Sequence, residues 1–426
     1  MDPIVVKQAY DAAVATYASY GVDVAAALEK MKQIEVSVHC WQGDDVTGLE
    51  AVGGGTSGGI LSTGSFGGKP RTGDELRADI DKALSLLPGK QRLNLHACYA
   101  ELNGEAVDRD RYETRHFQNW IDWAKSRGLA LDFNATCFGH PMAADNLTLS
   151  HPDEKIRRFW IDHVKAVRKI AADMGQELGC TVVNNIWVPD GMKDMPADRT
   201  RYRALLKASL DEILAVKYPA EYLVDAVECK LFGIGVESYT VGSHEFYMGY
   251  AAHQHKLGNE GLLLTLDMGH FHPTETIADK VSSLLLFNPA VLVHVSRPVK
   301  WDSDHVVISD ESVQELMREI KRADAFDRVY LATDFFDGSI NRITAWTVGL
   351  RATQKAILAA LLEPTDLIKK AEDEGDYATR LALMEEFRNL PAMAVYNQFC
   401  LDQGVPAGSD YLPEIYAYTQ DVLSKR

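Results

Sequence analysis

Short apolar segments alternate with longer amphipathic segments along most of this chain, and this alternation constrains the fold more than any other feature. Eight segments have the length and apolar character of β-strands, namely 35–40, 92–97, 129–134, 180–187, 225–231, 262–267, 291–296 and 328–333. Helical patterns occupy much of the space between them, at 74–87, 112–127, 154–175, 201–217, 274–287 and 311–324. Strands that alternate with helices form parallel sheets. Eight such units predict an α/β fold, a closed (β/α)₈ TIM barrel rather than an open doubly wound sheet.

Helical segments flank the predicted barrel on both sides. Residues 4–33 have the pattern of a helix, so we divide the chain into an N-terminal helical segment (1–34), a barrel domain (35–340) and a C-terminal extension (341–426). The extension shows only helical patterns. We expect it to pack on the barrel or on a neighbouring subunit.

Charge and missing motifs disfavour several classes of partner. The 44 basic and 61 acidic residues give a net charge of −17, which argues against nucleic acid and against an anionic membrane surface. No Gly-x-Gly-x-x-Gly opens a helix after the first strand, and no Walker-type loop is found, so nucleotide binding loses support. No apolar run approaches the roughly 20 residues that cross a bilayer.

Cysteine usage and the N-terminus bear on the cellular compartment. The six cysteines lie far apart without a Cys-x-x-Cys pair, as expected for buried free thiols in a reducing compartment. The first residues lack a basic region followed by an apolar core, so no signal peptide is visible. We therefore expect a cytoplasmic protein.

Four successive strands in the second half of the chain run directly into acidic or imidazole side chains. These are Glu228, Asp267, His294 and Asp334. The carboxyl ends of barrel strands converge on the catalytic mouth, so the four side chains are expected to form one closed, oxygen-rich site with a single imidazole. Hard or borderline divalent cations favour this mixture of donors.

A second group of possible ligands lies just beyond two of these strands. His270, Asp302 and Asp304 would form an open set with positions left for water or substrate. Two carboxylates held two residues apart repel each other, and a divalent cation between them removes that penalty. Both sets fit Mn²⁺, Mg²⁺ or Co²⁺ better than a thiolate-bound structural Zn²⁺.

Each of these residues also has a structural interpretation. An Asp at a strand end is often a helix N-cap, which applies to Asp334 and to the Asp302/Asp304 pair. Trp187, at the end of the fourth strand, either plugs the core or forms an apolar wall for a sugar ring. Chance rarely ends four successive strands in ligand residues, so the joint pattern favours metal binding.

Two further features point to the barrel mouth. Glu228 and Lys230 are two residues apart, so in a strand both side chains point to the same face. Such a pair is costly to bury unless its members are paired or bound to a ligand. The glycine-rich segment 52–73 follows the first strand; it is either a flexible surface linker or, as we expect from its position, a mobile lid.

Long segments of the chain resemble the L-rhamnose isomerase family, in the branch typified by enteric bacteria. The matching segments are 38–45, 93–96, 185–193, 231–235, 237–243, 269–275, 295–299, 301–307 and 339–342. They run through nearly the whole chain and are far more specific than a short motif. One departure is residues 253–262, which are a few residues longer than the family pattern and precede the sixth strand.

The resemblance implies reversible conversion of L-rhamnose to L-rhamnulose, with related aldoses as further substrates. It also implies a homotetramer and two divalent sites per subunit, with Mn²⁺ preferred and Co²⁺, Mg²⁺ or Zn²⁺ possible. The structural metal falls on the closed set, Glu228, Asp267, His294 and Asp334. The catalytic metal falls on the open set, His270, Asp302 and Asp304.

The resemblance assigns further roles around the sugar. Lys230 matches a lysine beside the substrate, His96 a histidine used in ring opening, and Trp187 the stacking aromatic. The expected catalytic residues are Lys230, His96, Asp302 and Asp334. The expected substrate contacts are His96, Trp187, Lys230, Glu228, Asp267 and His294.

The reaction has two possible routes, and the function has two rivals. A hydrogen crosses between C1 and C2 either by a metal-mediated hydride shift or by proton transfer through an ene-diol. Two metals with an intervening lysine favour the hydride shift, as in xylose isomerase, a relative by resemblance. The main rival is a metal-dependent TIM-barrel phosphodiesterase or nuclease, which the charge of −17 disfavours. A non-enzymatic binding barrel is disfavoured because buried carboxylates this dense are costly without a cation.

Overall fold

Eight parallel strands close into a barrel, as the sequence predicts. The computed structural model describes residues 1–50, 62–300 and 303–426. The strands follow one another around the barrel in the order β1-β10-β9-β8-β6-β4-β3-β2. Their bounds are β1 (Val36–His39), β2 (Gln91–His96), β3 (Ala130–Asn134), β4 (Val182–Trp187), β6 (Leu223–Glu228), β8 (Leu263–Asp267), β9 (Val291–Val295) and β10 (Val329–Thr333). Each of the eight predicted strands is therefore confirmed, with its ends shifted by a few residues at most.

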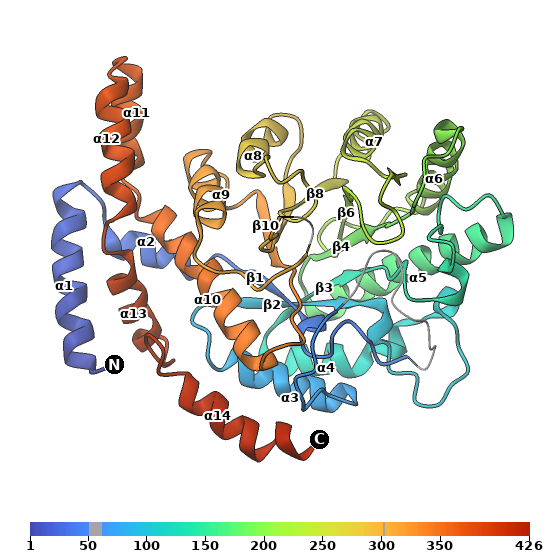
Figure 1. Ribbon diagram of the computed structural model, residues 1–426, viewed down its shortest axis with the longest axis horizontal. Coiled ribbons are helices and arrows are strands. Elements are labelled where there is room, and N and C mark those ends of the chain that lie inside the picture. The colour runs from blue at the N-terminus through green and yellow to red at the C-terminus, as the bar shows by residue number, and fades with distance from the viewer. Residues whose placement is uncertain (51–61, 301–302) are drawn as a thin grey trace.

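Helices surround the barrel and connect its strands (Figure 1). They are α3 (Gly73–Leu84), α4 (Gln118–Arg127), α5 (Glu154–Leu178), α6 (Arg199–Ile213), α7 (His244–Lys256), α8 (Ala278–Leu285), α9 (Glu311–Arg322) and α10 (Arg342–Leu361). The side chains of Asp153, Ser243 and Asp310 accept backbone hydrogen bonds at the starts of α5, α7 and α9, which fixes where these helices begin. The helix predicted at 112–127 is shorter, because residues 114–117 form a 3₁₀ turn before α4.

The N-terminal segment forms two helices where the sequence pattern predicts one over 4–33. These are α1 (Pro3–Ser19) and α2 (Val24–Met31). Gly21 lies between them with a φ of +77°, a left-handed conformation that glycine adopts readily and that often ends a helix. The carboxylate of Asp23 then accepts hydrogen bonds from two amides in the first turn of α2. The prediction of a single helix was wrong because it overlooked this turn and cap.

The C-terminal residues form helices, as expected. After α10 come α11 (Thr365–Asp373), α12 (Tyr377–Arg388), α13 (Ala392–Asp402) and α14 (Leu412–Asp421). Helix α10 packs against α9, α3 and α2, and α13 packs against α1. Figure 1 shows α11 and α12 together, projecting away from the barrel. None of the helices in the described residues is both long and apolar enough to span a bilayer.

The barrel interior changes character along its axis. Toward the amino ends of the strands, a small apolar cluster is formed by Val183, Ala226, Leu263, Leu292 and Ala332. Two residues further along the same strands stand the buried polar side chains Asn185, Glu228, Thr265 and His294 and the half-buried Asp334. Inward positions recur every second residue in a strand, so the sequence delivers these groups to the carboxyl end. Beyond β4 and β6, a short antiparallel pair joins β5 (Gly191–Met192) to β7 (Tyr239–Thr240).

Candidate active site

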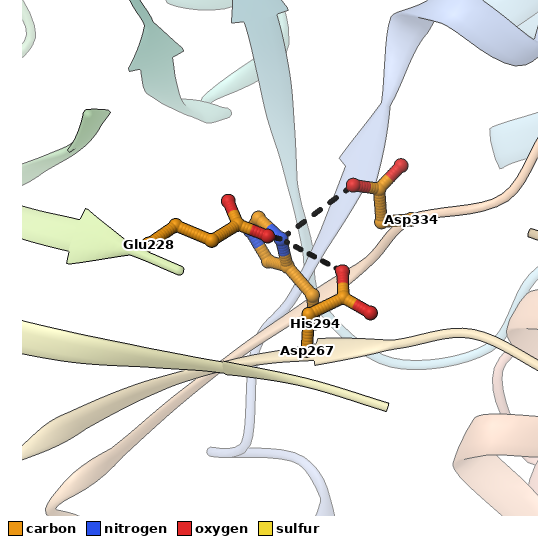
Figure 2. A group of neighbouring side chains, drawn as sticks. All are labelled: Glu228, Asp267, His294 and Asp334. Atoms are coloured by element: carbon orange, nitrogen blue, oxygen red, sulfur yellow. Dashed lines mark ion pairs between the residues drawn. The ribbon is translucent and has the colours of Figure 1, made fainter. Parts of the chain in front are cut away.

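Four side chains from four neighbouring strands meet at the carboxyl end of the barrel (Figure 2). They are Glu228 at the end of β6, Asp267 at the end of β8, His294 in β9 and Asp334 just after β10. One possible ligand atom from each lies within 4.8 Å of the others. The Nδ1 atom of His294 is 3.4 Å from Glu228 Oε1 and 3.5 Å from both Asp267 Oδ2 and Asp334 Oδ2. The structure thus brings together all four residues of the predicted closed set.

Strand register explains this convergence. Asp267 lies directly beside His294 in the pairing of β8 with β9, and His294 lies beside Ala332 in the pairing of β9 with β10. Asp334 follows Ala332 by two residues, so its side chain returns to the interior. Its amide still donates a 3.0 Å hydrogen bond to the carbonyl of Val295, which keeps the strand extended up to the ligand.

The cluster places three carboxylates beside a single imidazole, so its negative charges outnumber its positive charge. Glu228, Asp267 and His294 are at most 2% exposed. Burial raises the pKa of Asp334 to about 7; His294 opposes that shift, and the other two carboxylates add to it. Burial alone would lower the pKa of His294, but the surrounding carboxylates outweigh it and raise that pKa well above its usual value. Three carboxylates exceed the single charge that an imidazolium supplies, so a cation would balance the site.

The donor atoms fit a metal ion. Asp267 Oδ2 and both ring nitrogens of His294 are buried and have no hydrogen-bond partner among the described residues. A buried polar atom without a partner costs about 1–3 kcal/mol, and coordination to a cation would remove that cost. Within the described ranges, this is the one group of acidic, imidazole or thiol side chains whose ligand atoms lie close enough to hold an ion. The cluster is therefore suited to a divalent cation.

A small cavity of about 40 Å³ adjoins the cluster, and all the residues predicted to contact the sugar line it except Asp267. Trp187, Lys230 and His96 line it. The ammonium of Lys230 is 5.1 Å from the centre of the Trp187 ring, and the ring of His270 stacks on Trp187 at 6.2 Å between centroids. Trp187 is thus part of the cavity wall. Glu228 and Lys230 line the same cavity, as their spacing predicts, although β6 ends before Lys230.

His96 is held in its neutral form. Its Nδ1 atom is 3.3 Å from the hydroxyl of Thr136, and the ring of Trp41 packs edge-on against it at 4.8 Å. Burial lowers the pKa of His96 to about 3. At neutral pH the ring therefore offers one N–H donor and one nitrogen acceptor for hydrogen bonds to a sugar oxygen.

The second predicted ligand set is described only in part. The Nδ1 atom of His270 is 3.1 Å from Glu228 Oε1, and Asp304 lines the same cavity. Asp302 lies outside the described residues. Residues 51–61, which include the first part of the glycine-rich segment 52–73, lie outside them as well. The open metal set and the lid therefore stay predictions.

Comparison with known proteins identifies the family. A family model described as L-rhamnose isomerase (RhaA) matches residues 4–426. The L-rhamnose isomerase of Rhodopirellula baltica is 54% identical over 421 residues, covering 99% of this chain and 97% of that protein. The L-rhamnose isomerase of Pectobacterium carotovorum is 53% identical over 421 residues, covering 99% of each. This chain belongs to the L-rhamnose isomerase family.

Membership in the L-rhamnose isomerase family makes the chain an aldose–ketose isomerase and does not favour the nuclease alternative. Solved structures with a similar fold are more distant. A xylose isomerase domain protein from Alicyclobacillus acidocaldarius has a TM-score of 0.47 and 14% identity, covering 77% of this chain and 99% of that one. An L-ribulose 3-epimerase has a TM-score of 0.46 and 12% identity, covering 79% and 96%. At this distance these two structures say nothing about the site.

Two residues that support the cluster were missed by sequence reasoning. The indole of Trp41 donates a hydrogen bond to Asp334, and the amide of Asn185 donates one to Glu228. Both residues belong to segments that match the L-rhamnose isomerase family, at 38–45 and 185–193. Their presence in those segments was the available signal, but only the folded barrel shows which ligand each one contacts.

Proposed function

We propose that this chain interconverts the aldose L-rhamnose and the ketose L-rhamnulose with a bound divalent metal ion. The observation that carries the proposal is a buried acidic cluster at the barrel mouth of a chain from the L-rhamnose isomerase family. Its proposed ligands are Glu228, Asp267, His294 and Asp334. We expect Mn²⁺, with Co²⁺, Mg²⁺ or Zn²⁺ as possible substitutes. Related aldoses are expected as further substrates.

The residues around the cavity have distinct proposed roles. A divalent ion in the cluster supplies Lewis-acid polarisation of the sugar oxygens. Trp187 forms the wall against which the sugar packs, and the ammonium of Lys230 stabilises negative charge on O1. Neutral His96 exchanges a proton with the ring oxygen as the sugar ring opens. Asp302 and Asp334 complete the proposed catalytic set. Glu228, Asp267 and His294 are proposed to contact the sugar as well.

We favour a hydride shift from C2 to C1 over an ene-diol route. An ene-diol route needs a carboxylate that is free to act as a base, whereas the buried carboxylates of the described cluster are all proposed ligands. Lys230 lines this cavity beside Trp187, which supports the proposal that it stabilises charge on O1 during the shift. The presence of His270 and Asp304 at the same cavity supports a second ion on His270, Asp302 and Asp304.

We also propose a domain organisation and a subunit assembly. Residues 1–34 flank the barrel, residues 35–340 form the catalytic barrel, and residues 341–426 take part in packing between subunits of a homotetramer. Exposed apolar side chains on the projecting helix α12 support this role, since Tyr377 is 61% and Leu381 68% exposed. The six cysteines are free thiols, which supports a cytoplasmic location.

The direct test is an assay of metal-stripped protein with L-rhamnose. Ketose should form when Mn²⁺ is added, and L-rhamnulose should return L-rhamnose under the same conditions. The absence of ketose with Mn²⁺, Co²⁺, Mg²⁺ and Zn²⁺ alike would overturn the proposal. The same reaction in heavy water separates the routes, because a hydride shift leaves little solvent hydrogen in the product and an ene-diol introduces it.

A further inference from the structure

A chain of two hydrogen bonds links three strands beneath the cluster. The hydroxyl of Thr265 in β8 donates to Asn185 Oδ1 in β4 at 2.8 Å. The Nδ2 group of Asn185 donates in turn to Glu228 Oε2 in β6. All three side chains are at most 3% exposed. Solvent therefore does not compete for these bonds.

The chemistry of the three groups fixes which group donates and which accepts in each of the two hydrogen bonds. An ionised carboxylate only accepts hydrogen bonds, so the amide nitrogen of Asn185 must face Glu228. The amide oxygen then faces Thr265, whose hydroxyl is able to donate to it. Glu228 thus sets the orientation of the Asn185 amide, and the hydroxyl of Thr265 reinforces it by donating to the amide oxygen. Without the hydroxyl, the amide would lose the hydrogen bond that holds its oxygen in place.

The bond to Oε2 leaves the other oxygen of Glu228 facing the cluster. Glu228 Oε1 lies 3.1 Å from His270 Nδ1 and 3.4 Å from His294 Nδ1. Asn185 therefore holds the carboxylate by one oxygen and turns the second toward the position of the ion. Residues that orient a metal ligand in this way typically change metal affinity 10- to 100-fold when they are removed.

Asn185 also stands between two cavities. One is the cavity at the cluster, and the other, of about 160 Å³, lies toward the opposite end of the barrel and is lined by polar residues that include Ser37, Asn94 and Asp132. Glu228 lines only the first of these. The carboxylate is thus held by a hydrogen-bonding side chain that lies in the polar layer above the apolar cluster of the barrel, which supports a specific role for this amide.

We propose that Asn185, held by a hydrogen bond from Thr265, is a positioning residue that sets the divalent-metal affinity of the Glu228 cluster. This inference rests on the proposed metal-dependent function. It extends that function by naming two residues outside the proposed ligand set that act on the ion through the Glu228 carboxylate.

The test measures Mn²⁺ binding by isothermal titration of metal-free protein without sugar, with the binding event lost in Glu228→Gln assigned to the cluster. Asn185→Leu should weaken that binding 10- to 100-fold. Thr265→Val, which removes only the hydroxyl, should weaken it several-fold, and Thr265→Ser should restore it. The double variant should bind no more weakly than Asn185→Leu alone, because Thr265 acts only through the amide.

A matched control removes a hydroxyl from the same part of the barrel. Ser37 donates a 2.6 Å hydrogen bond to Asp132 and contacts no proposed ligand, so Ser37→Ala should leave Mn²⁺ affinity unchanged. Wild-type affinity in both Asn185→Leu and Thr265→Val would overturn the inference while leaving the metal site in place. Additive effects in the double variant would overturn the link between Thr265 and Asn185. Wild-type protein that binds no Mn²⁺ would overturn the metal-dependent function and this inference together.

Discussion

The indole Nε1 of Trp41 donates a 2.9 Å hydrogen bond to Oδ1 of Asp334. Trp41 follows β1, and Asp334 follows β10, the neighbouring strand in the closed barrel. The bond occupies one oxygen of Asp334, and the other oxygen lies 3.5 Å from His294 Nδ1. Trp41, in the first loop of the barrel, therefore orients Asp334, a proposed ligand that directly follows the last strand.

Trp41→Phe should weaken metal binding while preserving the fold. The substitution keeps an aromatic ring but removes the donor, and a hydrogen bond to a charged group contributes about 1.5–3 kcal/mol. We expect roughly tenfold or greater loss of Mn²⁺ affinity, measured by titration. Trp123→Phe is the control, because its indole bonds to Asp81 away from the cluster. Equal Mn²⁺ affinity in the two variants would contradict the role of Trp41.

Glu228→Gln should remove the stabilisation that a metal ion gives the fold. A ligand present at 100 times its Kd stabilises the native state by about 2.7 kcal/mol, so the Tm of the wild-type protein should rise with Mn²⁺. The Tm of the variant should stay nearly constant. Glu311→Gln serves as a control, since this glutamate is exposed and pairs with Arg388. A variant Tm that rises as in the wild type would exclude Glu228 as a ligand.

His270→Asn and Asp302→Asn should abolish turnover without unfolding the protein. Both residues belong to the proposed open metal set, and His270 also stacks on the Trp187 wall. We expect a loss in kcat of about 100-fold or more, with circular dichroism and Tm close to wild type. Full activity in either variant would remove that residue from the proposed second site.

Acid should destabilise the protein through a buried histidine remote from the cluster. The Nε2 atom of His163 accepts from the amide of Thr136, and its Nδ1 donates to the carbonyl of Arg109. Burial lowers the pKa of His163 to about 3, compared with about 6.5 in the unfolded chain. The unfolded state therefore binds more protons below pH 6.5, so this group's contribution to stability is present above that pH and is lost progressively toward pH 3.

The free energy of unfolding should fall by about 2 kcal/mol from pH 7 to pH 5 because of this one histidine. His163→Gln, which does not titrate, should therefore differ less from wild type in unfolding free energy at pH 5 than at pH 7. Denaturant unfolding at the two pH values measures the change. Replacing the exposed His253 by Gln should leave the pH dependence as it is in the wild type. A constant difference between wild type and His163→Gln would show that His163 titrates normally in the fold.

Local pattern was enough to predict the barrel and the cluster of acidic and imidazole side chains at its mouth. Strand-length apolar runs and their polar ends are properties of neighbouring residues, and barrel geometry then forces such ends together. For that reason Glu228, Asp267, His294 and Asp334 could be grouped from the sequence alone. The sequence also predicted that Lys230 faces the same side as Glu228, because the two residues are two positions apart. Both line the cavity, although the strand stops at Glu228.

Features that depend on contacts between distant residues escaped prediction. Trp41 and Asn185 each bond to a ligand on another strand, and strand register is needed to find such pairs. The segment of helix α7 was not among the helical segments named from the pattern, since its buried residues, Tyr247, Tyr250, Ala251 and Gln254, mix aromatic and polar types. The break between α1 and α2 depends on one glycine conformation and one cap. Asp302 and the first part of the predicted lid lie outside the described residues, so those two predictions stay untested.

Thr265, which supports Glu228 through Asn185, is separate from the side chains that are proposed to contact the sugar. Trp187 and Lys230 face the cavity that is proposed to hold the sugar, whereas Thr265 reaches the ligand set only through Asn185. We therefore expect metal binding and sugar recognition to depend on different side chains around the Glu228 carboxylate. Libraries that vary the inner positions should shift the preference among divalent ions, while libraries that vary the cavity wall should shift the preference among aldoses.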